Sequence, residues 1–193
     1  MSTYIQNFKK FQPLLNELIM RDIKTKYRKS ILGVFWTILN PLFMMVVLSV
    51  VFSNMFKFDV EYFPVYLLSG QLIFNFFNEA TTNAMGAIVA NGPLIKKIYV
   101  PKYMFVLSRI FSSSINLLAS FTAMIFVMLA MQVELHYTVL LAPIPLIFIV
   151  FFSLGVGLIL SAITVKFRDI MHLYSVFVTA LMYLTPVIYP MSI

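Results

Sequence analysis

Five long stretches of this chain contain no charged residue, and this pattern limits the folds open to it. An α-helix rises about 1.5 Å per residue, so roughly 20 apolar residues cross the hydrocarbon layer of a bilayer, which is about 30 Å thick. Each stretch is close to that length or exceeds it. The sequence therefore predicts about five membrane-spanning helices within residues 30–56, 62–78, 110–133, 135–165 and 170–193.

The composition agrees with a membrane protein and excludes a soluble domain. Hydrophobic residues make up 61% of the 193 residues and charged residues only 11%, too few to cover a water-exposed surface. The chain has no cysteine, which excludes disulfides, thiolate metal sites and a cysteine nucleophile. We predict one all-α integral membrane domain over residues 1–193, with a cytoplasmic interfacial amphipathic helix at 1–30 and spans at about 34–56, 64–90, 105–131, 139–163 and 172–190.

The lysines and arginines set the expected orientation in the membrane. All but one of the 14 lie before the first span, between the second and third spans, or between the fourth and fifth. Loops rich in these residues stay in the cytoplasm, so we expect a cytoplasmic N-terminus. Because the net charge of +7 is spread between apolar runs instead of forming a soluble patch, no nucleic-acid partner is expected.

The segment before the first span has the pattern of an amphipathic helix. Apolar residues recur at spacings of three to five after Pro13, and basic residues supply a cationic face. Such a helix is expected to lie along the membrane, either as a topology anchor on anionic lipid headgroups or as a docking surface for a partner. The apolar positions are Leu14, Leu15, Leu18, Ile19 and Ile23, and the cationic ones include Arg21, Lys24 and Arg28.

Polar residues form a stripe within the second span. Positions i, i+4, i+7 and i+11 lie on one face of a helix, and lipid does not solvate such a face. The stripe therefore faces either a helix partner or an aqueous path. Glu79 flanks it toward the cytoplasmic half, where we expect it to be hydrated or paired with Arg109; a proton relay is a less favoured interpretation. The stripe consists of Gln71, Asn75, Asn78 and Thr82.

Small polar residues repeat at helical spacing in the third and fourth spans. Small side chains let helices approach closely in a membrane, so the favoured role is helix packing and the alternative is contact with substrate. The positions are Ser108, Ser112, Asn116 and Ser120 in the third span, and Ser153, Gly157 and Ser161 in the fourth.

No catalytic or metal-binding constellation is present in the sequence. His136 and His172 fall on opposite predicted sides of the membrane, and no GxxxxGK[ST] phosphate-binding loop occurs. We therefore expect a chain that is not an enzyme and carries no metal or other cofactor. If it depends on ATP, another chain binds the nucleotide.

Five blocks of residues, in order over nearly the whole chain, resemble the motifs of one transporter family. That family is the ABC-2 type permeases that export polysaccharides and polyol phosphates. Phe74 departs from its pattern, since tryptophan is common at that position. The blocks comprise Arg21, Asp22, Ile23, Lys24, Tyr27, Ser30, Leu32, Gly33, Trp36 and Pro41; Gly70, Phe74, Phe76 and Phe77; and residues 94–102, 167–170 and 185–190.

The resemblance implies the assembly in which the chain works. It implies a half-channel in the bacterial cytoplasmic membrane that forms a homodimer and associates with two copies of a separate ATPase, which carry ATP and Mg²⁺. The cargo implied is a lipid-linked O-antigen, capsular or teichoic-acid-like polymer, moved outward.

Three groups of site residues follow. The resemblance implies that the amphipathic N-terminal helix and the inner loops contact the ATPase, and that the polar stripe lines or braces the path. The clustering of basic residues, Arg21, Lys24 and Arg28 among them, is the basis for the hypothesis that they attract the diphosphate of the lipid-linked substrate. The ATPase-coupling residues are Pro93, Leu94, Ile95, Lys96, Lys97, Ile98, Tyr99, Val100, Pro101, Lys102, Arg168 and Asp169. The signature residues are Arg21, Asp22, Lys24, Tyr27, Arg28, Gly33 and Trp36, and the path residues are Gln71, Asn75, Asn78, Glu79 and Thr82.

The helix count differs from that of the family, which normally has six spans. On this ground we expect the 193-residue chain alone not to restore polymer export. A drug or antibiotic exporter of the same superfamily is the alternative function, and a truncated, non-transporting partner subunit is another. A membrane enzyme requires clustered acidic or histidine residues at one interface, which the sequence lacks.

Overall fold

The computed structural model describes residues 2–27, 33–56, 62–134, 137–187 and 189. The described residues are mostly α-helical and contain no β-strand, which confirms the prediction of an all-α fold. The helices are α1 (Ser2–Tyr27), α2 (Trp36–Phe56), α3 (Phe63–Ala90), α4 (Gly92–Ile95), α5 (Tyr103–Ala130), α6 (Pro143–Lys166) and α7 (Ile170–Leu184), with 3₁₀ turns at Gly33–Phe35 and Tyr137–Leu141.

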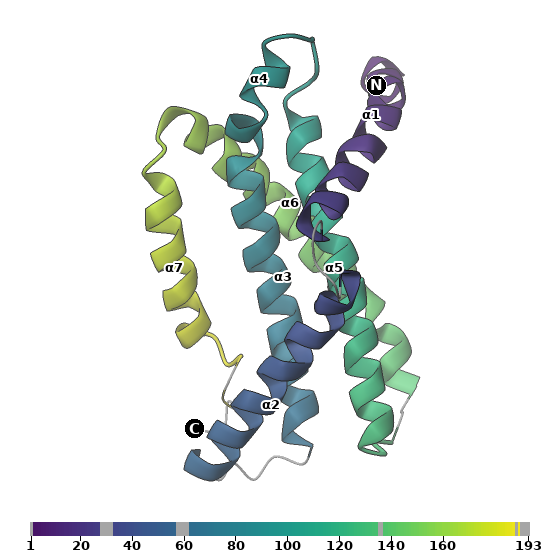
Figure 1. The fold of residues 1–193 in the computed structure, drawn as a ribbon, viewed down its shortest axis with the longest axis vertical. Coiled ribbons are helices and arrows are strands. Elements are labelled where there is room, and N and C mark those ends of the chain that lie inside the picture. The colour runs from purple at the N-terminus through teal and green to yellow at the C-terminus, as the bar shows by residue number, and fades with distance from the viewer. Residues whose placement is uncertain (1, 28–32, 57–61, 135–136, 188, 190–193) are drawn as a thin grey trace.

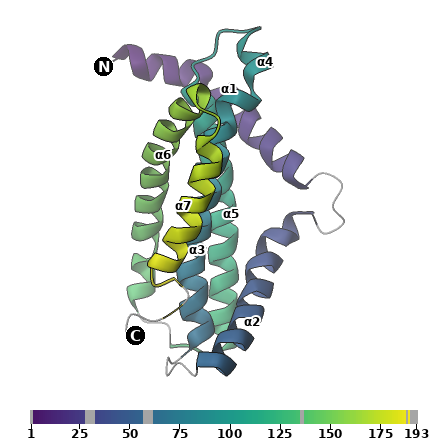
Figure 2. The same cartoon turned by 90° about the vertical axis from the view of Figure 1, so that its left-hand side faces the viewer.

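Helix α3 lies at the centre of an elongated bundle and packs most extensively against α5 and α6 (Figure 1). Successive long helices from α3 to α7 alternate in direction between the two ends of the bundle. The short helix α4 and the connection between α6 and α7 lie at one end, where α1 also begins before it runs toward the middle of the bundle (Figures 1 and 2). The basic connections of the sequence therefore share one end of the molecule with the start of α1.

Prolines mark where several helices begin and end. Pro64 lies in the first turn of α3 and Pro143 begins α6, where the missing N–H removes no hydrogen bond. Helix α7 ends at Leu184 because Thr185 is extended and precedes Pro186, whose ring disfavours helical backbone at the preceding residue. The helix is thus shorter than the span of 172–190 expected from hydropathy.

Close helix contacts occur at the small residues of α6. A Cβ atom added at Gly157 would lie 2.9 Å from the Cβ of Ala84 on α3 and 3.2 Å from Cδ1 of Ile110 on α5. Ser153 and Ser161 are buried on the same face of α6. The interpretation of this repeat as a packing surface is therefore confirmed.

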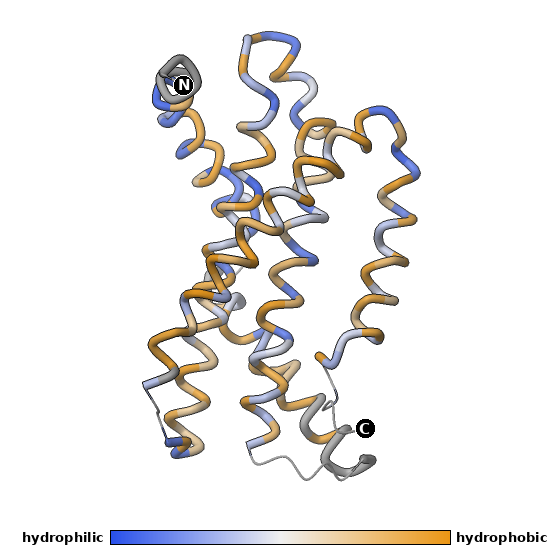
Figure 3. The backbone as a smooth tube through the Cα atoms, turned by 180° about the vertical axis from the view of Figure 1, so that it is seen from behind, coloured by the Kyte–Doolittle hydropathy of each residue, from blue (hydrophilic) through white to orange (hydrophobic). Residues whose placement is uncertain are grey.

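Much of the apolar surface faces outward. Residues Tyr103–Ala130 and Val139–Lys166 are long and apolar enough to cross a membrane, and only 28% and 22% of their most apolar windows are buried within the bundle. Trp36–Val47 and Ile170–Leu184 are shorter apolar helices. Hydrophobic colour predominates along the long helices in Figure 3. Such an apolar outer surface is suited to contact with lipid, and its exposure to water would be unfavourable.

The segment after α7 folds back onto the N-terminal half of α3. A Cβ atom at Gly70 would meet the carbonyl oxygen of Val187 at 2.9 Å, so only glycine allows this approach. The hydroxyl of Tyr66 donates hydrogen bonds to the carbonyl oxygens of Pro186 and Tyr189, at 3.1 and 2.9 Å. Two sequence blocks that are more than 100 residues apart thus contact each other.

Candidate functional site

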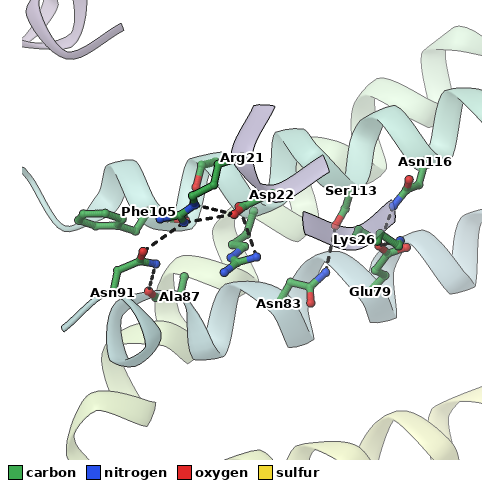
Figure 4. Close-up of polar contacts among 12 residues, drawn as sticks. Arg21, Asp22, Lys26, Glu79, Asn83, Ala87, Asn91, Phe105, Ser113 and Asn116 are labelled. Carbon is green, nitrogen blue, oxygen red and sulfur yellow. Dashed lines mark hydrogen bonds and ion pairs between the residues drawn. The ribbon is translucent and has the colours of Figure 1, made fainter. Parts of the chain in front are cut away.

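The C-terminal half of α1 is joined to α3 and α5 by a charged cluster around the buried carboxylate of Asp22 (Figure 4). Arg21 Nη2 lies 3.2 Å from Asp22 Oδ1, and Arg109 Nη1 of α5 lies 3.3 Å from Oδ2. The contact with Arg109 is an ion pair without hydrogen-bond geometry, because Oδ2 accepts no hydrogen bond. Arg21 also donates to Asn91 Oδ1 at 3.2 Å, which extends the cluster to the end of α3.

A third ion pair lies farther along α3, toward the middle of that helix. Lys26 Nζ and Asn116 Nδ2 both donate to Glu79 Oε1, each at 2.7 Å (Figure 4). The expectation that Glu79 pairs with Arg109 is wrong, because α1 brings Lys26 to Glu79 and brings Asp22 to Arg109. One carboxylate therefore connects α1, α3 and α5.

The apolar face of α1 packs on protein. Leu15 and Leu18 are buried in the same core cluster as Met104 and Phe105 of α5, with Leu14 and Ile19 packed against them. The amphipathic pattern expected from the sequence is present, and α5 covers its apolar side.

A charged cleft lies between α1, α3 and α5. Its volume is about 630 Å³, and its lining includes Arg21, Asp22, Lys26, Glu79 and Arg109. Three basic and two acidic side chains give it a small positive excess. Such a lining attracts anionic groups by charge, although each acidic group already has a basic partner at short range.

A second cleft, which we call the amide cleft, lies between α2, α3 and α5 and also has a volume of about 630 Å³. A small cavity of about 50 Å³ adjoins it, shares several lining residues with it and also includes Gln71. The Oε1 atom of Gln71 is buried and has no hydrogen-bond partner among the described residues. The amide cleft is lined by Trp36, Asn40, Asn75, Asn78, Glu79, Asn116 and Ser120, among others.

The structure brings most of the predicted stripe together at these two openings. Gln71, Asn75, Asn78 and Glu79 line the small cavity or the amide cleft. Thr82 is exposed and donates a hydrogen bond to Asn78 Oδ1 at 3.2 Å, but it lines neither opening. Sequence analysis did not include Asn40 among the site residues; its position beside Pro41, within an apolar span, was the available signal.

The residues of the N-terminal signature occupy different surroundings. Arg21 and Asp22 belong to the charged cluster, whereas Lys24 is exposed. Gly33 has a φ of +47° at the start of the turn that leads into α2, and Trp36 lines the amide cleft. Arg28 lies outside the described residues, as does the side chain of Tyr27.

The loop after α4 projects from the end of the bundle at which α1 begins (Figures 1 and 2). Tyr99 is 91% exposed and Val100 is buried, so the loop is held at one point and presents its tip to the surroundings. Arg168 and Asp169, in the α6–α7 connection, are exposed at the same end. The coupling candidates of residues 93–102 are otherwise exposed or half-buried: Pro93, Lys96, Lys97, Ile98 and Lys102 are exposed, and Leu94, Ile95 and Pro101 are half-buried.

No group of three or more histidine, aspartate or glutamate side chains in the described part of the chain is placed to hold a metal ion. The clefts instead contain amides, hydroxyls and paired charges. Such groups form hydrogen bonds and attract or repel charge.

Comparison with known proteins shows what the chain is similar to. The sequence profile of the family described as "ABC-2 type transporter" matches residues 13–193. The O-antigen export system permease protein RfbA of Myxococcus xanthus is 29% identical over 97% of this chain and 72% of that protein. The protein of the same name from Klebsiella pneumoniae is 27% identical over 91% and 68%. The polysialic acid transport protein KpsM of Escherichia coli is 24% identical over 90% and 69%.

Proposed function

The chain belongs to the ABC-2 type transporter family, and we propose that it is the membrane permease subunit of an ATP-driven exporter that moves a lipid-linked polysaccharide or polyol-phosphate polymer outward across the cytoplasmic membrane. The similar proteins support this cargo, because they are named for O-antigen export and polysialic acid transport. None of these names points to the alternative of a drug exporter.

The observation that carries the proposal is the polar cleft inside an apolar bundle. Amide and hydroxyl side chains at membrane depth are unfavourable unless they meet protein, water or a polar cargo. In this chain they lie on one face of α3 and line the cleft between α2, α3 and α5. We assign this face, with Gln71, Asn75, Asn78 and Glu79, to the translocation path.

The exposed inner loops support an ATPase partner. Residues 93–102 and the α6–α7 connection lie at the basic end of the bundle, which we place in the cytoplasm with the N-terminus. There they form a docking surface for an ABC-type ATPase, of which two copies hold ATP and Mg²⁺ and act on two copies of this chain. The energy of ATP hydrolysis reaches the path through that surface.

The charged cleft supports a role in binding the anionic end of the cargo. Its small positive excess, together with Lys24 and Arg28 in the adjoining segment, attracts a diphosphate by charge. Neutralising Arg21 and Arg28 together is expected to lower export while leaving membrane insertion unchanged. Unchanged export in that double variant would rule out this role.

The function is tested by deleting the gene in its host and measuring polymer on the cell surface and inside the cell. We expect the surface polymer to disappear and lipid-linked polymer to accumulate inside the cell. Reintroducing the gene as it stands in the host should restore export, whereas the 193-residue chain alone should not. If the deletion leaves the polymer on the surface and increases sensitivity to a toxic compound, the drug exporter is correct and the present proposal is wrong. The Gly155→Ala variant, which places a methyl group in open space, is the matched control for reintroduction.

A further inference from the structure

Two asparagine side chains in the amide cleft have unused hydrogen-bonding groups. Among the described residues, the side-chain amides of Asn40 on α2 and Asn75 on α3 have no hydrogen-bond partner, and both residues are exposed toward the cleft that they line. Each amide offers one acceptor oxygen and two N–H donors. This combination matches a hydroxyl group, which donates one hydrogen bond and accepts others.

Gln71 gives a second, independent indication of the ligand chemistry. Its side chain is buried, with the residue only 4% exposed, and its Oε1 atom has no donor in the described structure. Gln71 lines the small cavity that adjoins the amide cleft. Only a donor such as a hydroxyl or a water satisfies it, and an anionic oxygen does not.

The charge of the amide cleft disfavours an anionic cargo. Among the described residues, its charged lining side chains are Lys26 and Glu79, which lie 2.7 Å apart and cancel. The other described residues of the lining are neutral. A phosphate or carboxylate moved from water into this cleft would lose hydration without gaining a net positive charge, whereas a neutral hydroxylated unit exchanges water for amides.

Trp36 completes the chemistry. It is 44% exposed and lines the same cleft as the amides. An indole face offers a large apolar surface beside polar groups, a combination that suits the C–H face of a sugar ring. The cleft has a volume of about 630 Å³, which is within the range of pockets that hold drug-sized ligands. It is therefore large enough for a short run of sugar units.

We propose that the amide cleft binds an uncharged, hydroxyl-rich stretch of the cargo, so that the exported polymer is a neutral glycan and not a polyanion. This inference rests on the proposed function and narrows its cargo. Asn40, Asn75 and Gln71 supply the hydrogen bonds, and Trp36 supplies the stacking surface. The charged end of the cargo is left to the charged cleft, which lies on the far side of the Lys26–Glu79 pair.

Trp36 is the single tryptophan of the chain, so its fluorescence reports directly on the cleft. The purified full chain in detergent is titrated with a mannose hexamer and, separately, with a glycerol-phosphate hexamer. We expect the neutral hexamer to give a saturable change in tryptophan emission, with an affinity at least tenfold above that for the anionic hexamer. The Asn40→Ala/Asn75→Ala double variant should lower the affinity for the neutral hexamer at least fivefold.

Gln132→Gly is the matched control, because it removes an exposed amide at the opposite end of α5, at a positive φ where glycine fits. Equal or tighter binding of the anionic hexamer, or no response to either hexamer, overturns the inference. So does unchanged affinity in a folded double variant. The wild-type titration is decisive even if that variant fails to fold. Loss of surface polymer in the gene deletion together with no binding of the neutral hexamer would leave the exporter standing and reject only the neutral cargo.

Discussion

Lys26 of α1 and Glu79 of α3 form an ion pair with an Nζ–Oε1 distance of 2.7 Å, although 53 residues separate them in the sequence. Asn116 of α5 donates to the same oxygen, so the carboxylate of Glu79 is shared among three helices. Because both clefts include Lys26 and Glu79 in their linings, the pair stands between the charged cleft and the amide cleft. It connects the position of the N-terminal helix to the polar face of α3.

Reversing one charge of this pair should loosen the contact between α1 and α3. The side chains are 46% and 34% exposed, so the pair contributes only about 0.5 kcal/mol to the free energy of unfolding. Lys26→Glu and Glu79→Lys should each lower the Tm, and the combined reversal should recover part of the loss. Thermal unfolding of the purified variants measures this. Strictly additive effects in the double variant would show that the two side chains do not interact.

Removing the carboxylate of Asp22 should weaken the docking of α1 more strongly. Asp22→Ala leaves Arg21 and Arg109 without their shared counter-charge in a partly buried setting, which costs about 1 to 3 kcal/mol. The measurement is the rate of tryptic cleavage within α1, which should rise several-fold. Glu17→Ala, at an exposed position of the same helix, is the control and should leave the rate unchanged. Equal cleavage rates in the two variants would contradict the assignment.

The contact of α6 with α3 and α5 is tested by a glycine pair. Gly157→Ala forces a methyl group to within 2.9 Å of Ala84 and should lower stability by about 1 to 3 kcal/mol. Gly155→Ala, two residues earlier, meets no atom within 4 Å and should leave stability unchanged or slightly higher. The difference in Tm between the two variants measures the effect. A Tm for Gly157→Ala at or above that of Gly155→Ala would mean that the helices are farther apart than described.

Coupling to the ATPase is tested at two equally exposed tyrosines at opposite ends of the bundle. Tyr99 is 91% exposed on the inner loop, and Tyr137 is 92% exposed in the turn before α6. Tyr99→Ala should lower polymer export and the ATPase activity of the assembled complex at least threefold, because it truncates a side chain available to the partner. Tyr137→Ala should leave both unchanged. Equal losses would indicate a general effect of truncating an exposed aromatic residue.

Local periodicity was sufficient to predict the helices and the polar face of α3. The spacing of Gln71, Asn75 and Asn78 fixes them on one side of a helix whatever that helix packs against. The ion-pair partner of Glu79 could not be predicted from the sequence, because it depends on where α1 crosses the bundle. No local sequence pattern encodes that crossing. Sequence reasoning therefore expected Glu79 to be hydrated or paired with Arg109, and it did not consider Lys26.

Only some of the residues that line the amide cleft could be predicted from the sequence, for a similar reason. Asn75 belongs to a repeating polar pattern, whereas Asn40 is an isolated polar residue in an apolar span. Asn116 was grouped with small residues expected to serve packing, yet its amide reaches Glu79 at 2.7 Å. A site assembled from three helices needs their relative rotation, which follows from packing contacts such as Gly157 against Ala84.

The last prediction concerns the segment after α7. Gly70→Ala places a Cβ atom 2.9 Å from the carbonyl oxygen of Val187, and this is a backbone atom that has little freedom to move. The segment should be displaced, with loss of the hydrogen bond that the single hydroxyl proton of Tyr66 shares between the carbonyl oxygens of Pro186 and Tyr189, worth about 1 kcal/mol. Gly86→Ala is the control, since its Cβ would meet only the flexible tip of Met171 at 3.7 Å. The Tm of Gly70→Ala should fall by more than that of Tyr66→Phe, and Gly86→Ala should keep the wild-type Tm. Residues 70 and 187 both belong to blocks that resemble the same family. If Gly70→Ala keeps the wild-type Tm, the contact between these two residues does not explain why the blocks resemble that family.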